Sequence, residues 1–150
     1  MNGAARDEAV REYPDAPRVG VGIVLLRGDE VLLVRRGKPP AAGMWSLPGG
    51  AQELGETAGD CAKRELFEET GLHAGPVHLV GHVDSIHHDA AGRIQYHYTI
   101  LDFAARYEGG EPMPGGDALE AAWVHPARFD DYALWPEARR IIALARDRFG

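Results

Sequence analysis

The sequence predicts an α/β fold of the α+β kind, in which helices cover one mixed β-sheet. Runs rich in valine and leucine recur along the chain, and two segments of helical character interrupt and close the series of strands. The length of 150 residues suits one domain and leaves little room for two. We therefore expect an N-terminal lead-in over residues 1–17, followed by a single domain over residues 18–150.

A β-hairpin opens the predicted domain. Arg18 to Arg27 (RVGVGIVLLR) is typical of a strand, Gly28-Asp29 makes a turn, and Val31 to Arg35 returns as a second strand. Paired prolines make residues 36–42 a loop, because proline cannot donate to a regular ladder. The next segment, Trp45 to Gly50, is a short extended stretch that ends on two glycines.

The first helix is expected over Thr57 to Thr70. This stretch is rich in alanine, glutamate, lysine and leucine. Gly71 stands where a left-handed C-cap is expected, which places the end of the helix.

The second half of the domain begins with two long strands, Val77 to His87 and Arg93 to Ala104, around a turn at residues 89–92. In the second strand apolar residues alternate with polar ones, as expected of a strand with one buried face. The remaining predicted elements are a loop, a short strand, a turn of helix and an amphipathic closing helix: Tyr107 to Gly116, Ala121 to His125, Pro126 to Asp131 and Pro136 to Phe149.

The charge balance restricts the class of partner. A net charge of −7 argues against binding to a nucleic-acid polymer or to an anionic membrane, but it leaves room for a small anionic ligand in one pocket. The single cysteine, Cys61, cannot form an internal disulfide, which fits a reducing compartment. The polar N-terminal residues lack the apolar core of a signal peptide, so we expect a cytoplasmic protein.

Three carboxylates on the first helix carry the clearest chemical signal. At about 100° per residue, Glu65, Glu68 and Glu69 fall within roughly 100° of arc, where they repel one another. A hard divalent cation compensates such a cluster, and Mg²⁺ suits a few carboxylates together with waters and substrate phosphate. The alternative is an acidic, solvated helix face that binds no metal.

The flanking residues support the metal hypothesis. Arg64 lies beside the carboxylates and is placed to hold one of them through a bidentate pair, with Glu56 as the expected partner. Gly49 and Gly50 allow a tight turn that leaves a backbone carbonyl free to face the metal.

These residues resemble the Nudix box. Its pattern is glycine, five residues, glutamate, seven residues, then arginine, glutamate, an aliphatic residue, any residue, two glutamates, any residue, glycine and an aliphatic residue. Every fixed position is met, by Gly50, Glu56, Arg64, Glu65, Leu66, Glu68, Glu69, Gly71 and Leu72. The similarity extends over roughly Arg18 to Ala145, including the segments WSLPGG and AAWVHP.

The resemblance implies a fold and a reaction. The fold is the Nudix α/β/α sandwich, and the reaction is hydrolysis of a nucleoside diphosphate linked to another group, dependent on Mg²⁺ or Mn²⁺. By resemblance, the metal ligands are Glu65, Glu68, Glu69 and the Gly50 carbonyl, with Arg64 and Glu56 orienting them. A homodimer is a further expectation from the resemblance.

Two further sets of residues are candidates for the site. The resemblance implies that the general base comes from the loop before the tryptophan-bearing strand, where Asp117 and Glu120 stand. Alternatively, both are solvated loop acids, and Glu65 or Glu69 acts as the base. The basic cluster Arg35, Arg36 and Lys38 is a candidate for binding substrate phosphates, or alternatively a solvated strand end.

Three hypotheses about the substrate and the activity remain. Residues 38–45, which precede the Nudix box, and the strand over residues 96–103 look most like the ADP-ribose pyrophosphatase-like group. This similarity favours ADP-ribose or a related nucleotide sugar as the substrate. The alternatives are a sanitising hydrolase of damaged nucleoside triphosphates, such as 8-oxo-dNTPs, and a nucleotide sensor that has lost hydrolysis. The intact carboxylate set speaks against the sensor.

Overall fold

The computed structural model describes residues 11–150, so positions 1–10 of the expected lead-in lie outside the described residues. The rest of the lead-in contacts the sheet. The Tyr13 hydroxyl donates to Asp89 at 2.8 Å, and the Tyr96 hydroxyl donates to Glu12 at 2.9 Å. Residues 11–17 therefore lie against the β5–β6 hairpin described next.

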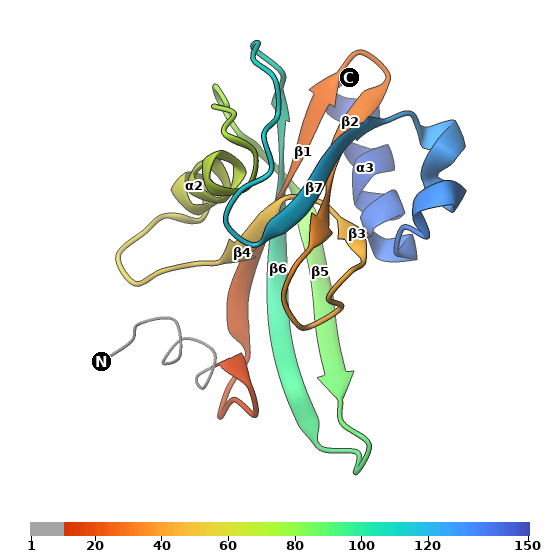
Figure 1. The fold of residues 1–150 in the computed structure, drawn as a ribbon. Coiled ribbons are helices and arrows are strands. Elements are labelled where there is room, and N and C mark those ends of the chain that lie inside the picture. Colours follow the sequence, from red (N-terminus) through yellow and green to blue (C-terminus); the bar gives the residue numbers. More distant parts are fainter. Residues whose placement is uncertain (1–10) are drawn as a thin grey trace.

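Seven strands form one mixed sheet in the described part of the chain (Figure 1). Its main path runs β3-β2-β1-β6-β5, while β4 pairs with β1 and β7 pairs with β2. Only β1 and β6 pair in parallel, and the other pairs recorded for these residues are antiparallel. The strands are β1 Arg18–Arg27, β2 Glu30–Arg36, β3 Trp45–Ser46, β4 Gly49–Ala51, β5 His78–His88, β6 Ile94–Arg106 and β7 Ala118–Val124.

Helices lie on both sides of the sheet. Helix α2, Ala58–Thr70, lies on one side, and helix α3, Pro136–Phe149, lies on the other beside the short 3-10 helix η1, Pro126–Tyr132 (Figure 1). This confirms the α/β/α sandwich with a mixed sheet between helices. None of the helices within residues 11–150 is long and apolar enough to cross a membrane.

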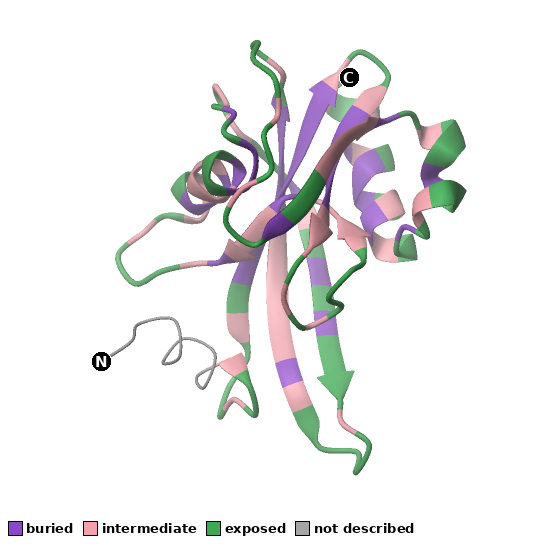
Figure 2. Cartoon of the chain, in the orientation of Figure 1, coloured by how far each residue is buried: buried purple, intermediate pink, exposed green. Residues whose placement is uncertain are grey.

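The central strand β1 explains why two cores form. Its side chains alternate, so Val24 and Leu26 pack in the cluster that includes Ile141 of α3. Ile23 and Leu25 pack in the second cluster, which includes Leu66 of α2. Figure 2 shows the result, with buried residues along the middle of the sheet and on the inner faces of both helices.

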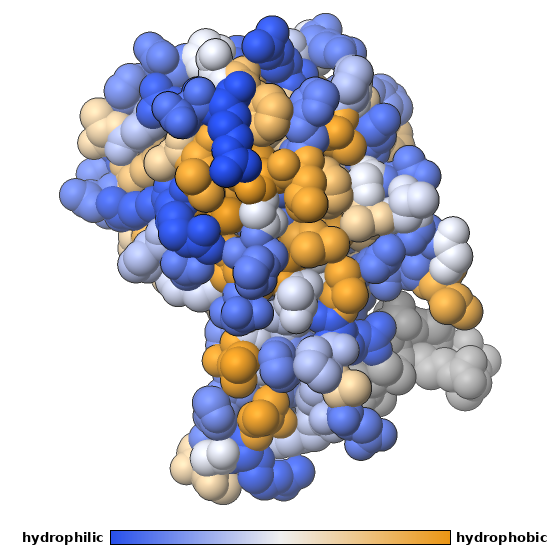
Figure 3. All heavy atoms as spheres, turned by 180° about the vertical axis from the view of Figure 1, so that it is seen from behind, coloured by the Kyte–Doolittle hydropathy of each residue, from blue (hydrophilic) through white to orange (hydrophobic). Residues whose placement is uncertain are grey.

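The β5–β6 hairpin extends beyond these cores. Its outer end carries mostly exposed residues, as Figure 2 shows. From behind, apolar side chains gather over the upper half of the molecule and hydrophilic ones dominate the lower extension (Figure 3). The cores therefore stabilise the upper half of the sheet, and the hairpin projects from it.

Local sequence sets the ends of helix α2. The Thr57 side chain accepts a hydrogen bond from the Asp60 N–H at 3.1 Å, which caps the first turn. Gly71 adopts φ 74°, the left-handed conformation expected of it, and ends the helix. Both observations confirm the predicted span.

Two strand predictions needed correction. The extended segment predicted over residues 45–50 is two strands, because β3 pairs with β2 whereas β4 pairs with β1 around Pro48. Strand β7 begins at Ala118, three residues before the predicted start at Ala121. A register shift next to Arg36 lets that residue pair with Ala118 and lengthens the ladder.

Candidate active site

Glu69 is the most deeply buried of the candidate carboxylates. It is 7% exposed, and the Gly49 N–H donates to its Oε2 at 2.9 Å. Burial raises the pKa of Glu69 to about 8, and the negative charge of Glu65 adds to that effect. The ionised form of Glu69 is therefore unfavourable in this position, and a positive charge nearby would stabilise it.

Glu65 lies next to Gly50 of strand β4. A Cβ at Gly50 would collide with the Glu65 carboxylate, so any larger residue there would displace this carboxylate from its position against β4. Burial raises the pKa of Glu65, although Arg64 donates to its Oε1 at 3.0 Å and opposes the shift. The Gly50 backbone and the Glu65 carboxylate therefore lie next to each other.

Arg64 organises the other acidic side chains. Its Nε and Nη2 donate to the two carboxylate oxygens of Glu56 at 2.7 and 3.1 Å, the bidentate pair expected from the sequence. These bonds lower the pKa of Glu56 to about 2. The same guanidinium donates to both oxygens of the exposed Glu68 at 3.1 Å and to the Ala51 carbonyl at 3.2 Å. Arg64 therefore ties helix α2 to strand β4.

The donor set fits a divalent cation bound through oxygen. The buried Glu69 and the partly buried Glu65 repel each other and lie beside Gly49 and Gly50 of β4. Within residues 11–150, however, no group of three or more His, Cys, Asp or Glu side chains is arranged closely enough to hold a metal ion. Arg64 engages both Glu65 and Glu68, which holds these carboxylates toward the guanidinium.

Both loop candidates for the general base are paired with the predicted basic cluster. The Glu120 carboxylate accepts from Arg35 Nε at 2.6 Å, and Asp117 lies 3.2 Å from Lys38 Nζ. The negative charge of Asp117 also contributes to the raised pKa of Glu69. The Gly115 N–H, two residues before Asp117, donates to the Glu69 carbonyl at 3.0 Å, so Asp117 follows a segment that contacts α2, while Glu120 belongs to the β2–β7 ladder.

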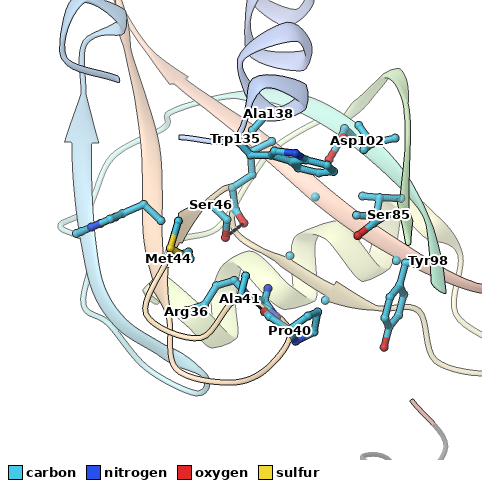
Figure 4. Close-up of a pocket in the computed structure, with 18 of the residues that line it drawn as sticks. Arg36, Pro40, Ala41, Met44, Ser46, Ser85, Tyr98, Asp102, Trp135 and Ala138 are labelled. Carbon is cyan, nitrogen blue, oxygen red and sulfur yellow. Dashed lines mark hydrogen bonds between the residues drawn. The ribbon is translucent and has the colours of Figure 1, made fainter. Parts of the chain in front are cut away.

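A pocket of about 460 Å³ adjoins the carboxylates (Figure 4). Gly49 and Gly50, the residues that contact Glu69 and Glu65, form part of its wall. Of the predicted basic cluster, Arg36 lines the pocket, whereas Arg35 and Lys38 are engaged by the acidic residues of β7 and its loop. The volume lies in the range of pockets that bind small molecules.

Figure 4 shows that the pocket has two chemically different ends. Trp135, Asp102 and Ser85 lie around one end, and Arg36 and Pro40 lie around the other. Trp135 is 46% exposed as a residue and lines the pocket.

Two pocket residues were not identified from the sequence. Arg11 lines the pocket, and its Nε is buried without a hydrogen-bond partner among the described residues, although the segment has no periodicity to mark it. Asp102 is 4% exposed, and burial raises its pKa to about 7. A signal for Asp102 existed: it continues the apolar alternation of Tyr98 and Ile100 as an acidic residue.

Comparison with known proteins gives a family match. The NUDIX domain model matches residues 16–145. The chain is 34% identical over 130 residues to an ADP-ribose pyrophosphatase of Methanocaldococcus jannaschii, covering 79% of this chain and 75% of that protein. It is 30% identical to an oxidized purine nucleoside triphosphate hydrolase of Mus musculus, covering 77% and 70%.

Structural comparison agrees with the family match. A crystal structure of a MutT NUDIX hydrolase from Burkholderia pseudomallei superposes with a TM-score of 0.68 at 28% identity, covering 87% of this chain and 98% of that one. Some relatives are much longer: the chain spans 42% of the NAD-capped RNA hydrolase NudC of Pseudomonas syringae, to which it is 34% identical.

Proposed function

This chain belongs to the NUDIX family of hydrolases, and we propose that it hydrolyses the diphosphate linkage of ADP-ribose or a related nucleotide sugar. The observation that carries the proposal is the contact between the buried carboxylates and the pocket. Gly49 and Gly50 touch Glu69 and Glu65 on one side and form the pocket wall on the other. A nucleotide in the pocket would therefore have its phosphates next to the carboxylate cluster.

We assign the metal-binding role to Glu65, Glu68, Glu69 and the Gly50 carbonyl. NUDIX hydrolases generally use divalent metal ions, and hard oxygen donors favour Mg²⁺, with Mn²⁺ as the alternative. When bound, such an ion supplies positive charge to the phosphates and lowers the pKa of a water molecule. Arg64 and Glu56 would orient the carboxylates, since the bidentate pair fixes Arg64 against β4.

The remaining site residues act on the substrate and on the attacking water. Arg11 and Arg36 line the pocket and would neutralise phosphate oxygens. Hydrolysis needs a general base. A carboxylate would accept a proton from the attacking water while the water oxygen bonds to phosphorus and the anhydride P–O bond breaks. Asp117 suits this role better than Glu120, because its charge acts on Glu69, whereas Glu120 is held on the ladder. Glu65 and Glu69 remain alternatives as the base.

A second candidate function is hydrolysis of oxidised purine nucleoside triphosphates. It is favoured by the similarity to the Mus musculus hydrolase of that name, which covers comparable shares of both chains. Both candidates use the same carboxylates and differ in the group that the pocket accepts.

A substrate panel separates the candidates. Purified protein with Mg²⁺ is incubated with ADP-ribose, other nucleotide sugars, dinucleoside polyphosphates, and normal and oxidised dNTPs, and the products are identified by chromatography. We expect ADP-ribose to give AMP and ribose 5-phosphate at the highest kcat/KM. Preferential release of pyrophosphate from an oxidised dNTP would replace the first candidate by the second. Tight binding without turnover of any compound would instead indicate a sensor.

A further inference from the structure

Asp102 stands at the end of the pocket that lies away from Arg36 (Figure 4). Its carboxylate is almost completely buried, with the residue 4% exposed, yet it borders the cavity. The proposed hydrolysis gives this side chain no role, because the metal-binding and phosphate-binding candidates lie on β4, on α2 and near Arg36. A buried acid facing a cavity therefore needs a separate explanation.

The sheet places Asp102 in the pocket. Tyr98, Ile100 and Asp102 alternate along β6, so their side chains share the face that forms the pocket floor. Gly22 of β1 lies directly opposite Asp102, and a Cβ at Gly22 would collide with the Asp102 Oδ1. The absence of a side chain at Gly22 leaves the room that this carboxylate occupies.

No hydrogen bond or ion pair engages the Asp102 side chain within residues 11–150. The charge of Arg140 acts on it, but the Arg140 guanidinium donates to the His82 carbonyl and to Glu137. A buried carboxyl group left without partners is costly, and the cost is recovered when a ligand supplies donors. The open side of Asp102 is the pocket.

The distribution of charged side chains along the pocket indicates which part of a nucleotide would lie next to Asp102. A carboxylate repels phosphate, whereas Arg11 and Arg36 attract it. Around Asp102 the wall combines Ser85 with Val83, Ile100 and the exposed Trp135, and the three apolar residues suit a flat aromatic group. The Asp102 end therefore fits the base, and the other end fits the diphosphate.

We propose that Asp102 is a specificity-determining residue that accepts a hydrogen bond from an amino group on the substrate's base. This inference rests on the proposed function, since it assumes that the pocket binds a nucleotide. A buried carboxylate oxygen discriminates strongly, because a base without a donor opposite it leaves that oxygen unpaired. Bases that bear an amino group, such as adenine, should be preferred over hypoxanthine, which carries a carbonyl at that position.

Matched ligands test the inference in two assays. Both assays are run near pH 8, where Asp102 is mostly ionised and acts only as an acceptor. Calorimetry compares AMP with IMP, and steady-state kinetics with Mg²⁺ compares ADP-ribose with its hypoxanthine analogue. We expect the wild type to favour the amino-bearing ligand by about 10-fold or more, the difference lying in Kd and KM rather than in kcat. Asp102→Leu, which has nearly the same shape but no hydrogen-bonding atoms, should reduce the preference to less than about 2-fold.

Controls keep the outcomes distinct. Asp84→Asn removes an exposed carboxylate from the neighbouring strand and should leave the preference unchanged. If Asp102→Leu does not fold, Asp102→Asn replaces one of the two acceptor oxygens by a donor and should lower the preference at least about threefold. Equal affinity of the wild type for AMP and IMP, or an unchanged preference in the variants, overturns the role of Asp102. Absence of turnover with AMP still preferred overturns only the proposed reaction.

Discussion

Glu69 and Asp102 are both buried acids, but their surroundings differ. Both have pKa values raised by burial, Glu69 to about 8 and Asp102 to about 7. Glu69 receives the Gly49 N–H and adjoins Glu65, so it belongs to a group of charges that a cation would complete. Asp102 has no such neighbours and faces a pocket. Each is an acid that the fold tolerates at a cost in stability.

The cost of burying Asp102 should depend on pH. Its pKa is about 7 in the folded protein and ordinarily 3.8, so the folded state binds the proton more tightly than the unfolded state. The free energy of unfolding therefore falls as pH rises through that interval, with Arg140 opposing part of the loss. Asp102→Asn should stabilise the protein by roughly 2–4 kcal/mol near pH 8 and by much less near pH 4, measured by urea unfolding. An equal effect at both pH values would contradict the assignment.

Residue spacing was enough to place the carboxylates of the box. Glu65 and Glu69 lie on one helix face, and the pairing of Arg64 with Glu56 follows the expectation. Spacing within the helix could not reveal that Arg64 also donates to Glu68 and to the Ala51 carbonyl. Ala51 belongs to β4, and its position relative to α2 depends on the tertiary fold. It also could not show that the Asp102 side chain has no hydrogen-bond partner among residues 11–150, since that depends on β1, β5 and β6 together.

At the scale of elements, helix α2 is the one that positions the chemistry. Thr57 caps its start and Gly71 ends it in a left-handed conformation. Leu66 and Cys61 are fully buried on the face that packs against the sheet, and burial raises the pKa of the Cys61 thiol to about 12. The polar face is thereby fixed toward β4 and the pocket.

Loss of the cap should loosen this helix measurably. Thr57→Ala removes the acceptor of the Asp60 N–H and should lower the free energy of unfolding by about 1 kcal/mol. Thr57→Ser keeps the hydroxyl and should stay within about 0.5 kcal/mol of the wild type in urea unfolding. The same loss in both variants would show that the hydroxyl does not act as a cap.

Element boundaries were predictable where local chemistry decides them. The hairpin β1–β2 and both long helices agree with the sequence, since turns, caps and periodicity act within a few residues. The split of residues 45–50 into β3 and β4 and the early start of β7 were not predictable, because they depend on which distant strand each segment pairs with.

At the scale of the molecule, the apolar clusters that stabilise the fold and the pocket proposed to bind substrate occupy different regions. Apolar clusters on both faces of the sheet hold helices α2 and α3, while the pocket opens where β1, β4, β5 and β6 meet the start of α3. The net charge of −7 is concentrated in part on the acidic residues of the box, so an acidic protein can still receive an anionic diphosphate once a cation is bound. The extent of one domain over residues 18–150 stays a prediction.

We propose that the carboxylates of α2 promote hydrolysis by holding a divalent cation. The most direct measurement is the rate of ADP-ribose hydrolysis by Glu69→Gln at saturating Mg²⁺, with Glu111→Gln as an exposed control. Because the substitution removes a ligand charge with little change of volume, the rate should fall about 100-fold or more while thermal unfolding stays cooperative. The control should retain the wild-type rate. A folded Glu69→Gln variant that hydrolyses ADP-ribose at a near-normal rate would contradict the account.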